Sequence, residues 1–411
     1  MQVLRLSLLL VAAAALSCSY ALSEGQSEPL LRRLKVLHHR EALVSRGKNG
    51  WSSVQYPKGA VEADIPVRGG SLRLFAMSKK GLDHSKIKRA VFVIHGQGRD
   101  PWNYYSHMTA ALNDAVADGL VKKEEVGIWA PSFWDTADTG AFPYDENTKT
   151  ATSNIMAWHG SDWVDGAANK IPKTDQGVSS FEVLDDVVSY FSNKALFPKV
   201  ETVVLAAHSA GSQMLHRYAQ LGKVPIASGG TEVHFYIANP ASWLYLDERR
   251  PEKGIGGATS RSKCPTYNEY KYGLNDINEN LPYGPVSDAA SIYKRYKSRY
   301  VHYQLGTGDH AQGSAACEAG VQGESHLTRG EIYQAYLQLL GSYPKRHTID
   351  YVPGIGHDDK AMFSSTEGKY RLFVQNQSQG KTRASTIPKG YSNGRTVTFT
   401  GFSKKAADNM P

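Results

Sequence analysis

The stretch Val203–Gln213, with the sequence VVLAAHSAGSQ, constrains the fold more than any other feature. A short apolar run ends abruptly at Ser209, and a helix-forming segment follows at once and continues to about Leu221. This change of pattern predicts a buried strand, a sharp turn that presents the serine hydroxyl, and a helix that begins directly after it. Ala207 and Gly211 keep the flanking positions small, as a strained turn of this kind requires. The same pattern also occurs in ordinary strand-to-helix turns, so the surrounding segments must show which kind of turn this is.

An apolar, β-branched run upstream, Ala90–Ile94, ends at the loop His95–Gly98. We predict a strand there, followed by a loop whose backbone approaches the serine. The amides of Gln97 and Ala210 are then the expected oxyanion-hole donors. A glycine-rich turn without such a role is the alternative for this loop. His95 itself is expected to be a structural hydrogen-bonding residue beneath the loop.

Two strand-like segments downstream each lead into a glycine-containing loop with a titratable residue. Tyr300–Leu305 precedes the loop that ends at Asp309, and His347–Val352 precedes the loop that ends at His357. The chain order serine, acid, histidine is that of the α/β-hydrolases among serine-hydrolase folds. Open α/β sheets place their chemistry beyond the carboxyl ends of strands, where Ser209 and these two residues would all lie.

These residue types predict a serine-hydrolase mechanism. A serine hydroxyl is a poor nucleophile at neutral pH, so His357 is expected to take its proton and later return one to the leaving group. Asp309 would orient the imidazole and stabilise its protonated form. The reaction needs no metal and no organic cofactor, and we expect neither.

Several nearby residues could compete for the acid and base roles: His208, His310, His326, Asp358 and Asp359. The histidine next to Ser209 should point away from the apex of the turn and pack or shape the site. The two later histidines are expected at the surface or around the site. A carboxyl group directly after His357 cannot easily curl back onto the imidazole, which favours Asp309 as the acid.

The chain resembles secreted serine hydrolases of the α/β-hydrolase superfamily, an esterase-like group best known from uncharacterised fungal and related eukaryotic sequences. The resemblance covers roughly residues 88–370 and is carried by HGQGRD (95–100), SSFEVLDDVVSYF (179–191), HSAGSQ (208–213), RYA (217–219), ANPASWLYLDERR (238–250), GTGD (306–309) and VPGIGHD (352–358). It implies an α/β-hydrolase fold, with a mostly parallel central sheet flanked by helices and lid-like insertions, and a Ser-Asp-His site. The group implies no single substrate.

Residues 1–21 are typical of a secretory signal, with Arg5 before the apolar block Leu6–Leu16 and small residues at Ser19–Ala21. The block is too short to span a membrane comfortably, and no other stretch approaches about 18 apolar residues. We therefore expect a secreted, extracellular protein without stable membrane insertion. Residues 22–60 mix charges without an apolar stripe, which predicts a flexible leader or pro-segment.

We predict the hydrolase domain over residues 61–370, with insertions near 131–178 and 240–293, and a C-terminal extension over 371–411. In the tail, Tyr370–Val374 and Thr396–Thr400 are strand-like and could form a hairpin laid against the core. An oxidising compartment favours a disulfide between Cys264 and Cys317, since Cys18 falls in the signal. Two unpaired buried cysteines are the alternative. Asn376 begins the only N-glycosylation sequon.

The amino-acid composition limits the classes of binding partner to be expected. The chain has 411 residues, of which 41% are hydrophobic and 21% charged, so it can bury a large core. The net charge of +8 is a mild bias, and no aromatic-basic module accompanies it, so nucleic acid is not expected as a partner.

The two insertions are rich in aromatic residues: Phe133, Trp134, Phe142, Tyr144, Trp158, Trp163, Trp243, Tyr245, Tyr267, Tyr270 and Tyr272. Core packing is the better interpretation for any single one, but Trp158 and Trp163 are the predicted substrate-binding residues. We expect a small-molecule or lipid-like ester substrate. A peptidase or amidase on the same triad, and an inactive binding or effector protein, are the alternatives.

Overall fold

The computed structural model describes residues 50–145, 147–148, 150–224, 227–228, 230–389 and 397–400. The predicted signal, and the predicted leader up to residue 49, lie outside these residues. No helix within the described ranges combines the length and the apolar character needed to cross a bilayer.

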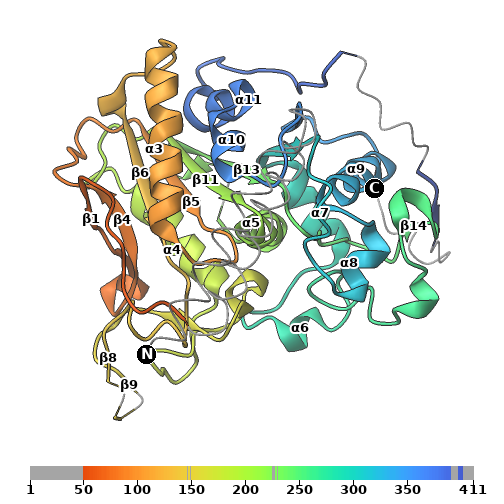
Figure 1. Ribbon diagram of the computed structural model, residues 1–411, viewed down its shortest axis with the longest axis horizontal. Helices are drawn as coiled ribbons and strands as arrows, with labels where there is room; N and C mark the ends of the chain where they lie inside the picture. The colour runs from red at the N-terminus through yellow and green to blue at the C-terminus, as the bar shows by residue number, and fades with distance from the viewer. Residues whose placement is uncertain are drawn as a thin grey trace, which may run out of the picture. The chain divides into compact units, whose positions relative to one another are not determined.

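A mostly parallel sheet forms the centre of the fold (Figure 1). Its main strands are β1 (Ala60–Glu62), β4 (Ala76–Lys79), β5 (Arg89–Ile94), β6 (Val126–Pro131), β11 (Thr202–His208), β13 (Thr231–Ala238), β15 (Tyr300–Gly306) and β16 (His347–Val352). Their order is β1-β4-β6-β5-β11-β13-β15-β16, and the short β12 (Ala227–Ser228) pairs with β13. Neighbours are parallel from β6 to β16, whereas β1 and β4 are antiparallel. The predicted fold class is therefore confirmed.

The central strands are buried on both faces, which explains their uninterrupted apolar sequences. In β5, Phe92 belongs to the core layer on one face and Val93 to the layer on the other. Leu205 and Ala206 of β11 divide between the two layers in the same way. Successive side chains of a strand point to opposite faces, so a strand covered on both sides needs an apolar residue at almost every position.

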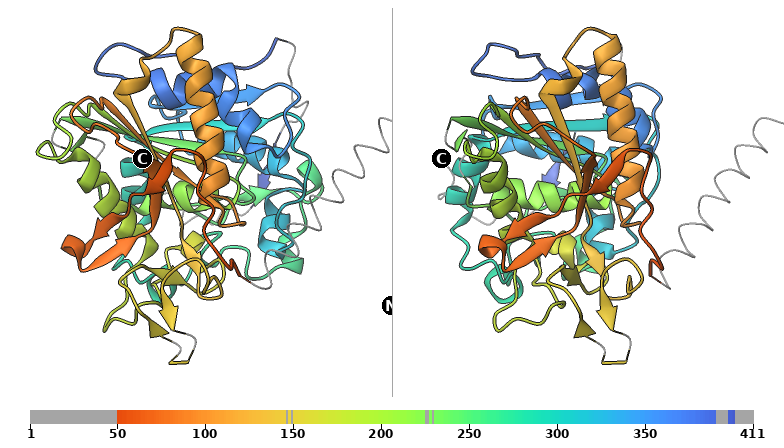
Figure 2. Two further views of the ribbon diagram at one scale, coloured as in Figure 1. Left: turned by 60° about the vertical axis from the view of Figure 1, so that its left-hand side comes forward. Right: turned by 90° about the vertical axis from the view of Figure 1, so that its left-hand side faces the viewer.

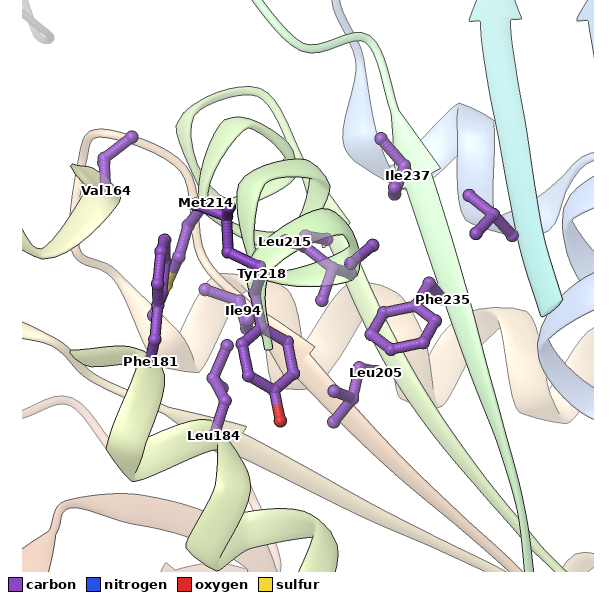
Figure 3. Packing of buried hydrophobic residues seen from close by; sticks show 14 of the residues in the cluster. Ile94, Val164, Phe181, Leu184, Leu205, Met214, Leu215, Tyr218, Phe235 and Ile237 are labelled. Atoms are coloured by element: carbon purple, nitrogen blue, oxygen red, sulfur yellow. The ribbon is translucent and has the colours of Figure 1, made fainter. Parts of the chain in front are cut away.

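Helices cover both faces of the sheet (Figures 1 and 2). One layer contains residues of α3 (Pro101–Ala117) and α10 (Asp359–Ser364). The other contains residues of α4 (Ser180–Ser192), α5 (Ala210–Leu221), α7 (Ala289–Lys297) and α9 (His326–Leu339). Figure 3 shows Phe181 of α4, Met214 of α5 and Leu205 of β11 among the side chains of this second layer. The predicted helix over 210–221 is confirmed.

The strand order reverses between β5 and β11, which are direct neighbours in the sheet. After β5 the chain passes to β6 on one side, and β11 then pairs with the other side of β5. The segments that follow β5 and β11 therefore meet at the carboxyl edge of the sheet. This is the position where open α/β sheets form their binding crevices.

The insertions contain short elements. Residues 131–178 include β7 (Trp134–Asp135), β10 (Ala157–Trp158) and η4 (Asp162–Asp165). Residues 240–293 include β14 (Arg250–Pro251), η6 (Arg261–Lys263) and α6 (Ile277–Asn280). A disulfide joins Cys264, just after η6, to Cys317, the first residue of α8 (Cys317–Gln322). The expected cysteine pairing is therefore present, and it ties the second insertion to the segment after Asp309.

The predicted strands of the C-terminal tail are largely wrong. Tyr370–Val374 forms a π-helical turn, η7, after α11 (Thr366–Lys369), and not a strand. A short apolar run does not by itself distinguish a helix from a strand. Phe399–Thr400 does form a strand, β17, but it pairs with β14 and not with residues 370–374. Residue 396 and residues 401–411 lie outside the described residues.

Asn376 is buried in the turn that follows η7, with 2% of its surface exposed. Its side-chain amide donates a hydrogen bond to Thr202 Oγ1 at 2.9 Å, and its carbonyl oxygen accepts one from Ser378 Oγ at 2.9 Å. The nitrogen that would carry a glycan is thus used for packing in the folded chain.

A buried ion pair attaches η7 to the sheet. Arg371 donates from Nε and Nη2 to the two carboxylate oxygens of Asp350 on β16, at 2.8 and 3.1 Å. Neither side chain is exposed to solvent. The remaining guanidinium hydrogens bond to Gln375 Oε1 and to the carbonyl oxygens of Arg383 and Ala384. Because both charges are fully paired, each is tolerated in the core only while the other is present.

Removal of one member of this pair should therefore destabilise the folded protein. We expect Arg371→Leu to lower the free energy of unfolding by about 3–5 kcal/mol, because Asp350 would remain buried without its partner. Urea denaturation of the purified variants measures this. Lys86→Leu is the control, since Lys86 forms an ion pair with Asp83 that is more than half exposed, and its loss should cost less than about 1 kcal/mol. Equal small effects in both variants would contradict the assigned role of Arg371.

Candidate functional site

Ser209 lies at a sharp turn between β11 and α5, as the sequence predicts. Its backbone angles are φ 60° and ψ −123°, a conformation that residues with a side chain rarely adopt. The Ser209 amide donates to the carbonyl oxygen of Ala238 on β13 at 3.0 Å, and its carbonyl oxygen accepts from the Gln213 amide at 3.2 Å. These bonds to a strand and to a helix hold the strained turn in place.

Gly211 allows the helix to approach the neighbouring strand. A Cβ atom at this position would lie 2.5 Å from the carbonyl oxygen of His95 and 3.0 Å from that of Ile94. No side chain fits at such distances, so α5 can begin against the end of β5 only with glycine here. The contact brings the loop after β5 beside Ser209.

Ser209, His357 and Asp309 contact one another in series. His357 Nε2 lies 2.9 Å from Ser209 Oγ, and His357 Nδ1 lies 2.7 Å from Asp309 Oδ2. With the proton on Nδ1, the imidazole donates to the carboxylate and its Nε2 accepts from the serine hydroxyl. The Asp309 side chain is fully buried, whereas that of His357 is 30% exposed.

Backbone packing between two loops brings the acid and the histidine together. Asp309 follows β15 and His357 follows β16, and these strands are parallel neighbours. A Cβ atom on Gly306 would overlap the carbonyl oxygen of Ile355, so the two loops can pass this closely only with glycine there. The Gly308 amide also donates to Ile355 O at 2.9 Å. The glycines of GTGD thus permit the contact between the side chains.

Asp309 is held in its ionised form. Burial alone would raise the pKa of its carboxyl group, but hydrogen bonds from His326 and His357 outweigh burial and hold that pKa well below its usual range. The carboxylate is therefore negative at neutral pH and can stabilise a positive charge on the imidazole.

His326 is not at the surface, contrary to one of the two places expected for it. It is 3% exposed, and its Nδ1 lies 3.1 Å from Asp309 Oδ1. Its ring stacks on that of His357, with centroids 4.1 Å apart and planes inclined by 18°. Sequence reasoning missed this contact because the only local signal is the helix start after Ser325. His310 is exposed, and the ring of buried His208 lies 4.4 Å from that of His357.

The loop His95–Gly98 passes beside the serine. A Cβ atom on Gly96 would lie 3.6 Å from Ser209 Cβ. In the part of the chain that the structure describes, neither the Gln97 amide nor the Ala210 amide has a hydrogen-bond acceptor. His95 is fully buried beneath the loop, with Nδ1 2.7 Å from Gly96 O and Nε2 accepting from the Phe133 amide at 2.9 Å. Burial lowers the pKa of His95 to about 3, so the ring is neutral.

A buried ion pair that the sequence did not reveal supports this loop from behind. Arg99 donates to Asp138 from Nε at 2.6 Å and from Nη2 at 3.0 Å, and to Gln97 O from Nη1 at 3.3 Å. Trp51 Nε1 donates to Gly98 O at 2.8 Å. Arg99, which Asp138 in the first insertion holds, thus fixes the carbonyl oxygen of Gln97, on the peptide that follows the Gln97 amide in the loop.

Asn239, directly after β13, contacts the ends of β15 and β11 and the loop after β16. Its side-chain carbonyl accepts from the Gly306 amide at 2.9 Å, and its Nδ2 lies 3.4 Å from Gly356 O and 3.4 Å from His208 Nε2. Its φ of 47° is a left-handed conformation that asparagine tolerates better than most residues.

The structure places the two predicted substrate-binding tryptophans in the hydrophobic core instead. Trp158 and Trp163 are both 0% exposed. Trp158 Nε1 donates to Ala167 O at 3.0 Å, and the ring of Trp163 lies 4.8 Å from His95. Aromatic residues are the largest apolar side chains available, so they fill the space beneath an insertion as readily as they line a pocket.

Asp309, His326 and His357 also place three potential metal-ligand atoms within 4.8 Å of one another. Their 2.7 and 3.1 Å separations are hydrogen-bond lengths. Ligands around a tetrahedral zinc ion with bonds of about 2.0–2.1 Å would have to lie farther apart. A second group contains Cys264 and Cys317, whose sulfurs are joined in the disulfide. We therefore assign no metal to either group.

Comparisons with known proteins identify the fold. No protein-family model matches the chain, and no match is found among curated protein sequences. The chain is similar to poly(aspartic acid) hydrolase-1 from Sphingomonas sp. KT-1, with 21% identity and a TM-score of 0.50 over 76% of this chain and 98% of that one. It is also similar to LpqC, a poly(3-hydroxybutyrate) depolymerase from Bordetella parapertussis, with 18% identity and a TM-score of 0.50 over 78% and 93%.

At these identities the similarity shows the fold alone, and it does not bear on the likeness to a fungal or eukaryotic group. The strand order, the flanking helices and these two structures together show that the chain has the α/β-hydrolase fold.

Proposed function

We propose that the protein is a serine hydrolase that cleaves carboxylic esters through an acyl-enzyme on Ser209. The observation that carries this proposal is the unbroken series of contacts from Ser209 Oγ through His357 to the buried carboxylate of Asp309. The serine lies on a strained turn at the carboxyl edge of the sheet, which presents its hydroxyl to His357. A role as an inactive binding protein is less well supported, since such a protein has no need to keep all of these groups.

The reaction begins when Ser209 Oγ attacks the ester carbonyl carbon and its proton passes to His357 Nε2. The tetrahedral intermediate collapses as His357 returns that proton to the departing alcohol, and the acyl group stays on the serine. Water, activated by the same imidazole, then attacks the acyl-enzyme. A proton returns to Ser209, and the carboxylic acid leaves.

The amides of Gln97 and Ala210 form the proposed oxyanion hole. Loss of one oxyanion-hole donor costs about 3–4 kcal/mol in related chemistry, and the hole acts without any movement when its dipoles are already fixed. Ala210 is the first residue of α5, so its amide direction is set by the helix. The peptide that contains the Gln97 amide is held at its carbonyl oxygen, Gly96 O, which lies 2.7 Å from His95 Nδ1. The next peptide along the loop is held by the contact between Gln97 O and Arg99.

The substrate class is proposed from chemistry and from the two similar structures. One of these is named a poly(3-hydroxybutyrate) depolymerase and the other a poly(aspartic acid) hydrolase, so an ester and an amide substrate both deserve a test. We favour a small-molecule or lipid-like ester because the triad suffices for ester cleavage. We also propose that the protein is secreted, since the Cys264–Cys317 disulfide is typical of oxidising compartments.

A fluorophosphonate probe and a panel of p-nitrophenyl esters test the proposal. We expect the probe to label the wild type, and at least one ester to be hydrolysed faster than the matching p-nitroanilide. Ser209→Ala should abolish labelling and lower kcat by on the order of 10⁴–10⁶-fold, because the nucleophile is lost. Ser161→Ala replaces an exposed serine and should leave both unchanged. Labelling that survives in Ser209→Ala would contradict the assigned nucleophile.

The Arg99–Asp138 ion pair, which supports the loop His95–Gly98, leads to a separate prediction. Asp138→Asn removes the charge that holds Arg99, so Gln97 O should lose its fixed contact and the loop that carries the Gln97 amide should shift. We expect kcat for the best ester to fall by up to about 100-fold with little change in KM, since misplacement of a catalytic group can cost this much. Steady-state kinetics measures this, with Asp83→Asn, an exposed carboxylate, as the control. An unchanged kcat would show that the loop does not depend on the Arg99–Asp138 pair.

A further inference from the structure

We infer that His326 is a positioning residue that holds the Asp309 carboxylate toward His357 during catalysis. The inference rests on the proposed function, because it assigns a role relative to that acid and base. His326 takes no part in proton transfer to the substrate in this account. It acts through Asp309.

The two carboxylate oxygens of Asp309 are divided between the two histidines. Oδ2 is 2.7 Å from His357 Nδ1, and Oδ1 is 3.1 Å from His326 Nδ1. A carboxylate held at one oxygen can rotate about its Cβ–Cγ bond. When both oxygens accept from fixed donors, that rotation is blocked and Oδ2 stays aimed at the base. Because the Asp309 side chain is fully buried, water is not available to replace the second donor.

The backbone at the start of α9 is attached to the same loop. The amide of His326 donates to Ala311 O at 3.0 Å, and the amide of Leu327 donates to Asp309 O at 3.1 Å. Ser325 and Thr328 form a capping box that fixes where the helix begins. His326 therefore holds the Asp309 side chain from a helix end that already binds the Asp309 main chain.

The imidazole of His326 has little freedom to turn away. One face stacks on His357, with a centroid distance of 4.1 Å. At the Nε2 edge of the ring, a Cβ atom on Gly313 would overlap His326 Nε2, so the loop backbone packs closely there. Gly313 itself has a φ of 66°, which favours glycine there.

The charge state of His326 suits a donor role. Burial lowers its pKa, and the nearby charges of His357 and Arg329 lower it further, whereas contact with Asp309 raises it, with a net shift below the usual range. The ring is therefore neutral, and the carboxylate contact places its single proton on Nδ1. A neutral donor orients Asp309 and leaves its negative charge available to the imidazolium of His357.

Three variants test this inference: His326→Ala, His326→Asn and His310→Ala. The Nδ2 of asparagine is as many bonds from Cα as the Nδ1 of histidine, so it can restore the donor without the ring. His310 is the exposed neighbour of Asp309 and is the matched control. The readouts are kcat and KM for the best p-nitrophenyl ester, the rate of fluorophosphonate labelling, and the thermal midpoint of unfolding.

We expect His326→Ala to lower kcat and the labelling rate by about 10- to 100-fold, with KM within about twofold of wild type. His326→Asn should recover most of the loss, and His310→Ala should match wild type. Wild-type kcat in His326→Ala would overturn the inference. Equal losses in the Ala and Asn variants, in step with a lower thermal midpoint, would assign His326 a packing role only.

The proposed function can fail separately. If the wild type is neither labelled nor active, or if Ser209→Ala is labelled equally, the serine-hydrolase proposal falls and the role of His326 falls with it. If labelling depends on Ser209 but not on His326, only the present inference is wrong.

Discussion

The approach of α5 to the end of β5 sets the geometry of the whole site. With glycine at position 211, the first turn of the helix rests on the carbonyl oxygens of Ile94 and His95. The strained turn at Ser209, the loop after β5 and the first amide of the helix consequently share one small region. A methyl group at position 211 would separate them, however well each segment were formed on its own.

Buried charged groups are paired both around Ser209 and at β16. Arg99 pairs with Asp138, Arg371 pairs with Asp350, and Asp309 lies between two imidazoles. Each charged group is buried away from water, and protein donors or acceptors replace its hydrogen bonds to water. Such pairs contribute little net stability, but they fix orientation: that of the Gln97 carbonyl, that of the helical turn at Arg371, and that of the Asp309 carboxylate.

The sequence predicted those features that depend on local pattern. Buried parallel strands such as β5 and β11 need apolar residues throughout, and the loops after β15 and β16 need glycine. Both requirements produce a local pattern that can be recognised in the sequence. Contacts between distant segments produce no such local pattern. The interaction of Asp309 with His326, and that of Arg99 with Asp138, exist only in the folded protein. Trp158 and Trp163 lie in the core and not in a pocket, and the sequence does not distinguish the two, because an aromatic residue suits either environment. Tyr370–Val374 is a helical turn and not the predicted strand, because a short apolar run suits both.

The crystal structure of the protein after reaction with an alkyl phosphonate would test the central claim most directly. The account predicts phosphorus bonded to Ser209 Oγ, with the phosphoryl oxygen within hydrogen-bond distance of the Gln97 and Ala210 amide nitrogens. A phosphonate on another residue, or a phosphoryl oxygen directed away from both amides, would contradict it.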